Sequence, residues 1–294
     1  MMSYILLVLA AVLLAFDFAL NKLYQQIRGT KPESTLLFNS LLGLVTAFVF
    51  FAINNFKFDC STFSIIMAML QSIFVMSYNI IGFKLLKAGT MAIYTMFLMI
   101  GGMVLPYIFG LIFLDESVGI VRILALMIII IGVALSSYQK NKIHKKQILM
   151  YIVVFFLNGL VSIVSKIHSI GESYGAVTAG EFIIIGGIIK FFLAGVMYLI
   201  YRNKNQVTEQ ICREKGKLGK SIAIIFLSAA IGGGSYLLQL NGAKTLPATV
   251  LYPFITGGSI VFSTLVGKIA FKEKLSAKVV VSVVMCLVGT IMFL

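Results

Sequence analysis

The chain is poor in the residues that build catalytic and metal sites. It contains no tryptophan, three cysteines and two histidines, and only 10 acidic residues. The cysteines are widely separated, and they give neither a disulfide framework nor a metal-ligand spacing: Cys60, Cys212 and Cys286. A membrane enzyme needs convergent His, Cys, Asp or Glu groups, and the sequence shows no zinc, phosphate-loop or nucleophile-elbow pattern. We therefore expect neither an enzyme nor a metal or other cofactor.

Charged residues are also scarce, at 12% of the 294 residues, whereas soluble domains contain about a quarter. The mean hydropathy is +1.04. Apolar residues form about ten runs of about 20 residues, each long enough to span a bilayer as a helix: 3–24, 34–53, 63–86, 90–114, 118–138, 147–168, 175–201, 219–242, 247–271 and 276–294. Because backbone groups in lipid must be hydrogen-bonded within each segment, the sequence predicts an all-α polytopic membrane protein, which we place in the plasma membrane.

Lysine and arginine at the ends of the apolar runs carry the net charge of +14. A nucleic-acid binder gathers such charge on a folded soluble face, so we interpret these residues as topology determinants and expect no nucleic-acid partner. The breaks after odd-numbered runs hold most of the basic residues. The other breaks carry fewer, interspersed with acidic residues: Lys57, Arg122 and Lys244 with Asp59, Asp115, Glu116 and Glu172. The positive-inside rule then places the odd-numbered breaks in the cytoplasm and both termini outside.

Short motifs recur at a spacing of about half the chain. The matching positions are Ser77 and Tyr78 with Ser235 and Tyr236, Gly101 and Gly102 with Gly257 and Gly258, Lys22 with Lys166, and Ala92 with Ala248. Because they occur in the same order, they predict two homologous five-helix halves, 1–143 and 144–294, in a single transmembrane domain of residues 1–294. An odd number of helices per half inserts the second half upside down relative to the first, as in the inverted repeats of many secondary transporters.

With this organisation the chain resembles a known family. Ten helices as five plus five, Gly-rich fourth and ninth runs, and the short acidic breaks FLDES (113–117) and FKEKLS (271–276) are similar to the EamA-like branch of the drug/metabolite transporter superfamily. The resemblance covers essentially the whole chain through loose motifs of Gly, Ala, Pro and one Glu. It implies a carrier of small metabolites, often an exporter, with a central cavity between the halves. Ten-helix relatives usually have both termini in the cytoplasm, opposite to the charge distribution, so the orientation stays open.

Two charged residues lie deep in apolar runs. Asp17 is about 14 residues into the first run, which is a depth of about 21 Å along a helix. Such a carboxylate is either a titrating site that exchanges a proton for substrate, as the first-helix carboxylate does in the related small multidrug resistance transporters, or a structural residue neutralised by Lys22 or Lys190. Lys190, near the middle of the seventh run, can pair with Asp17, bind a substrate carboxylate or extend its stem to an interface.

Uncharged polar residues within the runs are candidates for a cavity wall, because aromatic rings with a hydroxyl suit small amphipathic ligands. They are Tyr78, Asn79, Tyr94, Asn158, Tyr236, Gln239, Asn241 and Tyr252. The alternative is that they form only hydrogen bonds between helices. Lysines within about two turns of helix ends are expected to extend to the membrane interface: Lys22, Lys84, Lys87, Lys166 and Lys268.

Glycine and proline mark places where helices can approach closely or bend. Gly101, Gly102, Gly257 and Gly258 permit close approach, and Pro106 and Pro253 free backbone carbonyls. These residues are candidate hinges for alternating access, with close packing as the alternative. The runs 118–138 and 276–294 are nearly uniformly aliphatic, so we expect them at the periphery and the other eight around the cavity.

These features predict a secondary transporter, with export favoured, of a small metabolite such as an amino acid or an amphipathic compound. It would work by alternating access, with protons as candidate coupling ions. A channel would more typically show filter loops or charged rings, and we see neither. The alternative function is a flippase of a lipid-linked sugar or other amphipathic lipid. The expected partners are the substrate and the lipid bilayer, with the chain as a monomer or homodimer.

The one-sided basic breaks give a test of topology. A single cysteine at Asn141 in a cysteine-free chain should be protected from a membrane-impermeant thiol reagent in intact cells, whereas one at Thr62 should react, because the positive-inside rule places the first in the cytoplasm. Labelling of right-side-out cells, with permeabilised cells as the control, measures this. The reverse pattern would establish the orientation that the family resemblance implies.

Overall fold

The computed structural model describes residues 2–29, 31–87, 91–137, 145–205, 215–272 and 275–293. Within these ranges the chain forms ten α-helices and one short 3-10 helix, and no strand. They are α1 (Met2–Arg28), α2 (Pro32–Ile53), α3 (Thr62–Lys87), α4 (Met91–Phe113), α5 (Ile120–Ser137), α6 (Lys145–Ile170), η1 (Glu172–Tyr174), α7 (Ala179–Asn205), α8 (Lys215–Thr245), α9 (Ala248–Phe271) and α10 (Ala277–Ile291). The prediction of an all-α chain of about ten helices is confirmed. The predicted junction of the halves at 143 and 144, and Asn141, lie outside the described residues.

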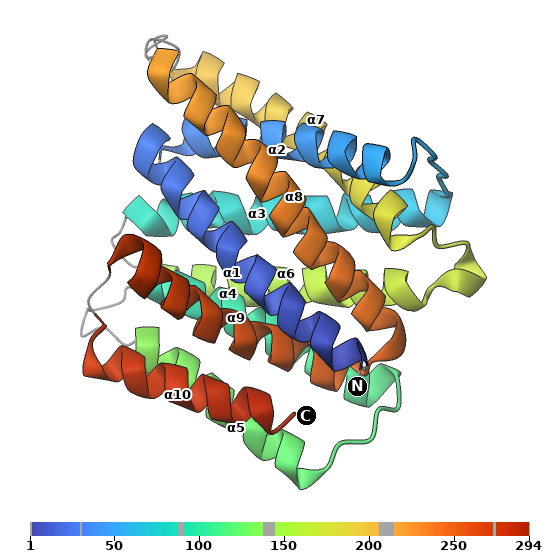
Figure 1. Cartoon of the computed structure of the whole chain (residues 1–294), viewed down its shortest axis with the longest axis vertical. Helices are drawn as coiled ribbons and strands as arrows, with labels where there is room; N and C mark the ends of the chain where they lie inside the picture. Colours follow the sequence, from blue (N-terminus) through green and yellow to red (C-terminus); the bar gives the residue numbers. More distant parts are fainter. Residues whose placement is uncertain are drawn as a thin grey trace.

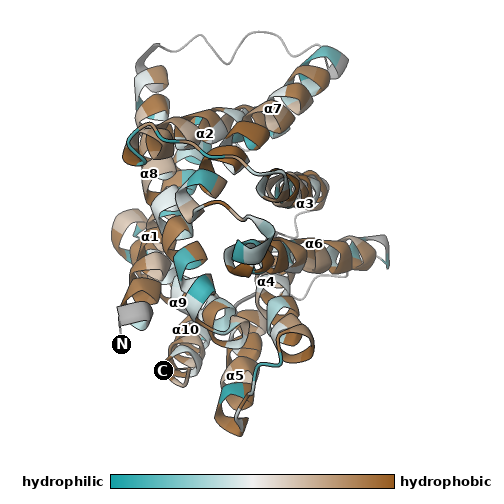
Figure 2. Ribbon diagram, turned by 90° about the vertical axis from the view of Figure 1, so that its right-hand side faces the viewer, coloured by the Kyte–Doolittle hydropathy of each residue, from teal (hydrophilic) through white to brown (hydrophobic). Residues whose placement is uncertain are grey.

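Eight of the ten helices are long and apolar enough to cross a membrane, namely α1 to α4 and α6 to α9. The helices α5 and α10 are apolar but shorter, with 18 and 15 residues. Both fall inside longer predicted runs, because α5 begins only at Ile120 and α10 ends at Ile291. Hydrophobic residues cover most helical turns, and hydrophilic residues gather mainly at helix ends and connections (Figure 2). The chain is therefore a multi-pass membrane protein.

The chain runs back and forth, so helix ends lie on two sides of the molecule (Figure 1). Odd-numbered helices end, and even-numbered helices begin, on the left-hand side of Figure 1. Basic residues gather at these ends: Arg28, Lys31, Lys145, Arg202, Lys220, Lys268, Lys272 and Lys278. We call this side the basic side and the other, which holds the turn between α8 and α9, the opposite side.

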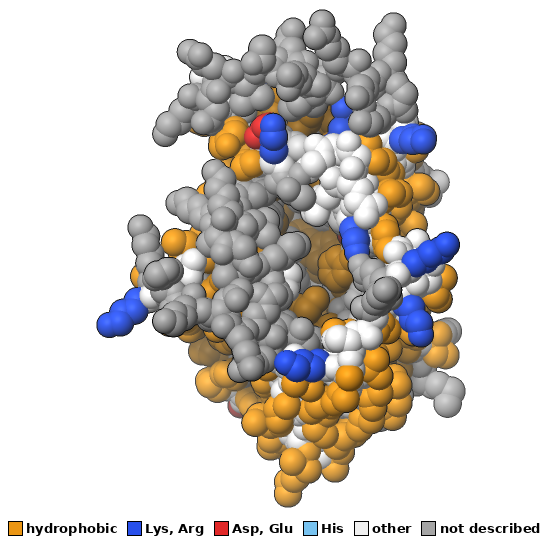
Figure 3. Space-filling model, turned by 90° about the vertical axis from the view of Figure 1, so that its left-hand side faces the viewer, with side chains coloured by type: hydrophobic (Ala, Val, Ile, Leu, Met, Phe, Trp, Pro, Cys, Tyr) orange, Lys and Arg blue, Asp and Glu red, His pale blue; other side chains and the backbone are white. Residues whose placement is uncertain are grey.

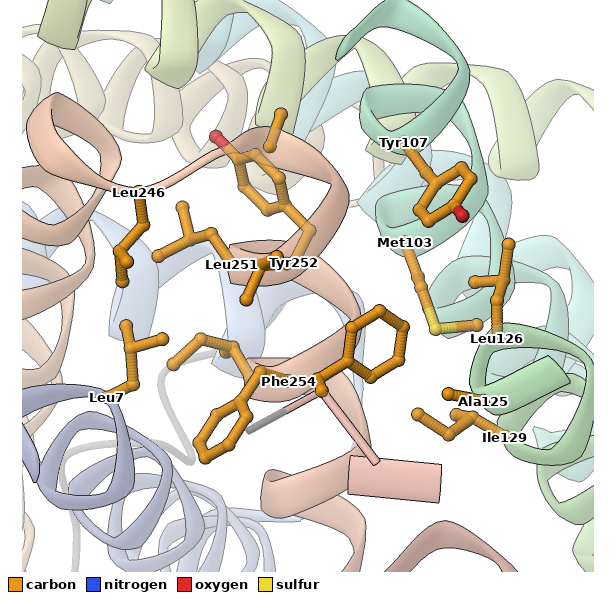
Figure 4. Close-up of a cluster of buried hydrophobic side chains, with 14 of the residues drawn as sticks. Leu7, Met103, Tyr107, Ala125, Leu126, Ile129, Leu246, Leu251, Tyr252 and Phe254 are labelled. Carbon is orange, nitrogen blue, oxygen red and sulfur yellow. The ribbon is translucent and has the colours of Figure 1, made fainter. Parts of the chain in front are cut away.

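Most helices pack against helices from the other half of the chain. α1 contacts α8 and α9, α2 contacts α7 and α8, α3 contacts α6 and α7, and α4 contacts α6 and α9. The main apolar cluster joins α1, α4, α5, α8, α9 and α10, and Figure 4 shows Leu7 of α1, Phe254 of α9 and Ile129 of α5 among its members. Val133 is buried in this cluster and Val283 packs against it. Helices α5 and α10 therefore pack against each other, and the sequence predicts their place at the periphery but not this contact.

Glycines set the closest helix approaches. A Cβ at Gly43 of α2 would lie 2.7 Å from the carbonyl oxygen of Gly187 on α7, and a Cβ at Gly187 would lie 2.7 Å from that of Gly43. Small residues allow such contact between helix backbones in lipid. The predicted hinge glycines also face neighbouring helices closely: Gly101 faces Phe155, Gly102 faces Asn158, Gly257 faces Thr290 and, at a longer 3.1 Å, Gly258 faces Ala11. The structure thus shows them in close packing.

The crossing of α2 and α7 gives a stability test. We expect Gly187→Ala to destabilise the protein by about 1–3 kcal/mol, because the added methyl group must displace the backbone of α2. Gly186→Ala is the matched control, since a Cβ at Gly186 meets nothing within 4 Å. That variant should be neutral or slightly more stable, because alanine favours helix. Thermal unfolding in detergent measures both. Equal midpoints would show that the crossing relaxes freely.

Candidate functional site

A central cavity of about 510 Å³ lies between the helices. Residues of α1 to α4 and α6 to α9 line it, and in the described part of the chain α5 and α10 contribute none. Much of the wall is apolar, with Phe18, Met76 and Phe182 among its residues. The polar residues of the wall are Asp17, Thr46, Gln71, Ser72, Tyr78, Asn158, Ser162, Ser165, Lys190, Ser228, Tyr236, Gln239, Tyr252, Thr256 and Ser259. The cavity therefore suits an amphipathic ligand.

Asp17 lies on this wall, where α1 approaches α8. Ser228 of α8 donates a hydrogen bond to Oδ1 of Asp17, and Asn21 donates Nδ2 to Oδ2 at 3.1 Å. Gly232 lies one turn beyond Ser228, and a Cβ there would come within 2.8 Å of the carboxyl carbon of Asp17. Ser228 and Gly232 therefore hold the carboxylate against α8. Neither residue is predicted from the sequence, although a spacing of four residues puts them on one helix face.

Lys190 lines the same cavity from α7. It lies close enough to Asp17 for the two charges to interact, without a direct ion pair. Its ammonium has no hydrogen-bond or ion-pair partner among the residues that the structure describes. A side chain on a central cavity wall does not extend to the membrane interface. Two of the predicted roles of Lys190 remain, namely electrostatic pairing with Asp17 and binding of an anionic group of the substrate.

A polar cluster joins three helices beside these charges. Gln71 of α3 donates to the Tyr236 hydroxyl of α8 at 2.6 Å and to Oγ of Ser165 on α6 at 3.0 Å. The Ser165 and Tyr236 hydroxyls are 2.9 Å apart. Gln71 and Ser165 were not identified from the sequence, although Gln71 is the amide nearest the centre of its apolar run. The cluster fixes the Tyr236 ring on the wall, next to the Gln239 of the same helix.

A second group of hydrogen bonds follows from Pro106. Proline has no N–H, so the carbonyl of Gly102, four residues earlier, lacks its helical partner. Ser162 of α6 donates to that oxygen at 3.1 Å, and Asn158 donates Nδ2 to the carbonyl oxygen of Leu98 at 2.7 Å. The Tyr252 hydroxyl donates to the carbonyl oxygen of Ser162 at 2.6 Å. Asn158 and Tyr252 therefore line the cavity while joining α4, α6 and α9.

Three predicted wall residues lie outside this wall, namely Asn79, Tyr94 and Asn241, and Asn241 is exposed. Asn79 is half-buried on α3, next to Tyr78, which does line the cavity. Tyr94 is buried in an apolar cluster with Leu85 and Tyr151, and its hydroxyl lies 3.4 Å from the carbonyl oxygen of Tyr78. Tyr94 therefore supports the segment that carries Tyr78. Within the described ranges, no group of three His, Cys, Asp or Glu converges to hold a metal ion.

Two charged side chains fasten the turn between α8 and α9 on the opposite side. Glu116 accepts hydrogen bonds at the start of α9 from the Ala248 amide at 2.7 Å and the Thr249 amide at 2.8 Å, and from the Thr249 hydroxyl at 2.7 Å. Lys166 donates to the carbonyl oxygens of Ala243 and Leu246 at the end of α8, both at 2.8 Å. Each charge has the sign that its helix terminus favours. These bonds hold the turn beside the cavity, whose wall includes Ala243.

Lys166 corrects a prediction. The sequence places it near a helix end, where a long side chain is expected to extend to the membrane interface. In the structure Lys166 is only 4% exposed. The carbonyl oxygens that α8 leaves without partners at its C-terminal end bind the ammonium instead. The position of α8 relative to α6 could not be inferred from the sequence of α6.

The basic side is open by contrast. Figure 3 views this side, and it shows a hollow with hydrophobic side chains inside and Lys and Arg side chains around it. The hollow opens on the side that carries the basic helix ends (Figure 3), and the hydrogen bonds of Glu116 and Lys166 lie on the opposite side.

The fastening of α9 gives the next prediction. Glu116→Gln keeps the size of the side chain but replaces one acceptor oxygen with an NH₂ group that faces amide donors. We expect a loss of about 1–3 kcal/mol, seen as a lower thermal midpoint in detergent. Asp115→Asn is the matched control, because it removes the neighbouring charge from an exposed side chain at φ 50°, a conformation that asparagine tolerates. An equal effect of both variants would mean that net charge, and not the cap on α9, matters.

No family profile and no curated protein matches this chain. Among solved structures, a chain described only as the crystal structure of a protein matches it with a TM-score of 0.75 and 14% identity. The match covers 98% of this chain and 96% of that chain. At this identity the two chains share a fold, and the comparison assigns no function.

Proposed function

We propose that the chain is a secondary transporter of a small metabolite, such as an amino acid or an amphipathic compound, that works by alternating access. The observation that carries the proposal is the central cavity with Asp17 and Lys190 on its wall, open at the basic side and fastened by Glu116 and Lys166 at the other. A binding site in mid-membrane, reached from one side, suits a carrier.

The packing of the helices supports two related halves. A shift of five helices turns the α1–α8 contact into α6–α3, α1–α9 into α6–α4, and α2–α8 into α7–α3, and all of these contacts occur. The α2–α7, α4–α9 and α5–α10 contacts map onto themselves. With five helices in each half, the second half would be inverted relative to the first. The resemblance to EamA-like transporters in the plasma membrane agrees with this arrangement.

Asp17 is the proposed coupling residue. Binding can drive transport only if the affinity differs between two states. A carboxylate supplies that difference, because it is charged while the cavity is hydrated and must be protonated or paired with substrate when water is excluded. Ser228 and Asn21 hold it at the cavity wall in either case. Proton and substrate would then compete for the same oxygen atoms.

The transport test uses purified protein in proteoliposomes. Metabolite profiling of cells that overexpress the chain, compared with cells that lack it, first supplies the substrate. Asp17→Asn should fold normally but lose accumulation driven by a pH gradient, while substrate exchange at equal pH persists. Asp59→Asn, which removes an exposed carboxylate outside the cavity wall, is the control and should behave like the parent. If Asp17→Asn transports with the parent's pH dependence, Asp17 is only structural.

A further inference from the structure

The two charges of the cavity face the same space from different helices. Asp17 on α1 and Lys190 on α7 are the only acidic and basic side chains on the wall, as far as the structure describes it. They interact through their charges but form no ion pair. If they served only to neutralise each other, direct contact would be expected, because unpaired charges away from water are costly. Their separation leaves room for a ligand between them.

The carboxylate of Asp17 is held by hydrogen bonds but can accept more of them. Ser228 donates to one oxygen and Asn21 to the other. A carboxylate has about four lone-pair sites, so each oxygen can accept a further hydrogen bond. Both donors are neutral, so they do not compensate a negative charge on Asp17, and a cationic group that enters the cavity can do so.

The side chain of Lys190 has open space on the side of Gly186. Side chains in a helix lean toward the preceding turn, which for Lys190 is Gly186. Gly186 also lines the cavity, and a Cβ there would meet nothing within 4 Å. The three N–H donors of Lys190 have no partner in the described part of the chain. A carboxylate or similar anionic group can therefore approach Lys190 beside Gly186.

From this arrangement we infer that the cavity binds a zwitterion, with its cationic group on Asp17 and its anionic group on Lys190. The inference rests on the proposed function and names the substrate class of that site. A purely anionic ligand would neutralise Lys190 but leave Asp17 unpaired and repelling it, and a purely cationic ligand would do the reverse. A zwitterion neutralises both charges at once. Its carbon skeleton would lie against apolar wall residues such as Phe18 and Met76.

Binding to the purified full chain in detergent tests the inference with a ligand ladder. The zwitterions are leucine, β-alanine, γ-aminobutyrate and ε-aminocaproate, in which the two charges are progressively farther apart. Each is compared with the amine and the carboxylate that lack one charged group, for example butylamine and butyrate for γ-aminobutyrate. Ligand-induced thermal stabilisation ranks them, and equilibrium dialysis gives the affinities. We expect at least one zwitterion to bind about tenfold more tightly than both of its analogues, because each lost charged contact weakens binding by about that factor.

Substitutions of Lys190 and Asp17 test which residue binds each charged group of the zwitterion. Lys190→Met should leave the zwitterion binding no more tightly than its amine, and binding of the amine itself should strengthen because the ammonium that repels it is gone. Asp17→Asn should reduce it to that of the carboxylate. Lys268→Met, which removes a lysine outside the cavity wall, is the control. If Lys190→Met does not fold, Lys190→Gln and the parent ladder still decide the question.

The inference is wrong if no zwitterion of the ladder binds, or if the amine or the carboxylate binds as tightly as its zwitterion. Counterflow in proteoliposomes separates this outcome from failure of the proposed function. Binding of a zwitterion without translocation would support the site and contradict transport. Translocation of another solute, without zwitterion binding, would support transport and contradict the site.

Discussion

A bilayer offers no water to pair with polar groups, and this constraint governs where each polar group of the chain lies. The carbonyl that Pro106 frees on Gly102 is taken up by Ser162. Backbone groups without helical partners at the end of α8 and the start of α9 bind Lys166 and Glu116, respectively. Lys190 lacks such a partner in the described part of the chain, and it lines the cavity. An unpaired charge on a cavity wall is available to a ligand, which makes this cavity the candidate site.

The same constraint explains what the sequence could predict. Helices that span lipid can be recognised in the sequence by their length and apolarity. A charged residue such as Asp17 or Lys190 can be recognised because it interrupts an apolar run. Partners across helices leave no such signal. Ser228 is one small residue among many, and its bond to Asp17 depends on how α1 and α8 cross. Lys166 was assigned to the interface because its depth along α6 is visible in the sequence, whereas its neighbour α8 is not.

The hydrogen bonds of Glu116 and Lys166 would resist movement of the turn between α8 and α9. Glu116 accepts three hydrogen bonds and Lys166 donates two, all with a charged partner. Hydrogen bonds to charged groups contribute about 1.5–3 kcal/mol each, so water must replace them as the turn between α8 and α9 moves. The fastening is therefore strong while dry and weak once hydrated, which suits a gate in the proposed cycle.

The positions of the two cavity charges in the sequence carry the proposed mechanism one step further. Asp17 belongs to the first predicted half, whereas Lys190, Ser228 and Gly232 belong to the second. A ligand that contacts both charges would therefore span the two halves. Rocking of one half against the other changes the distance between its two contacts, so the affinity differs between the open and occluded states. That difference is what binding energy needs in order to drive a transport cycle, and a ligand held by one half alone would not provide it.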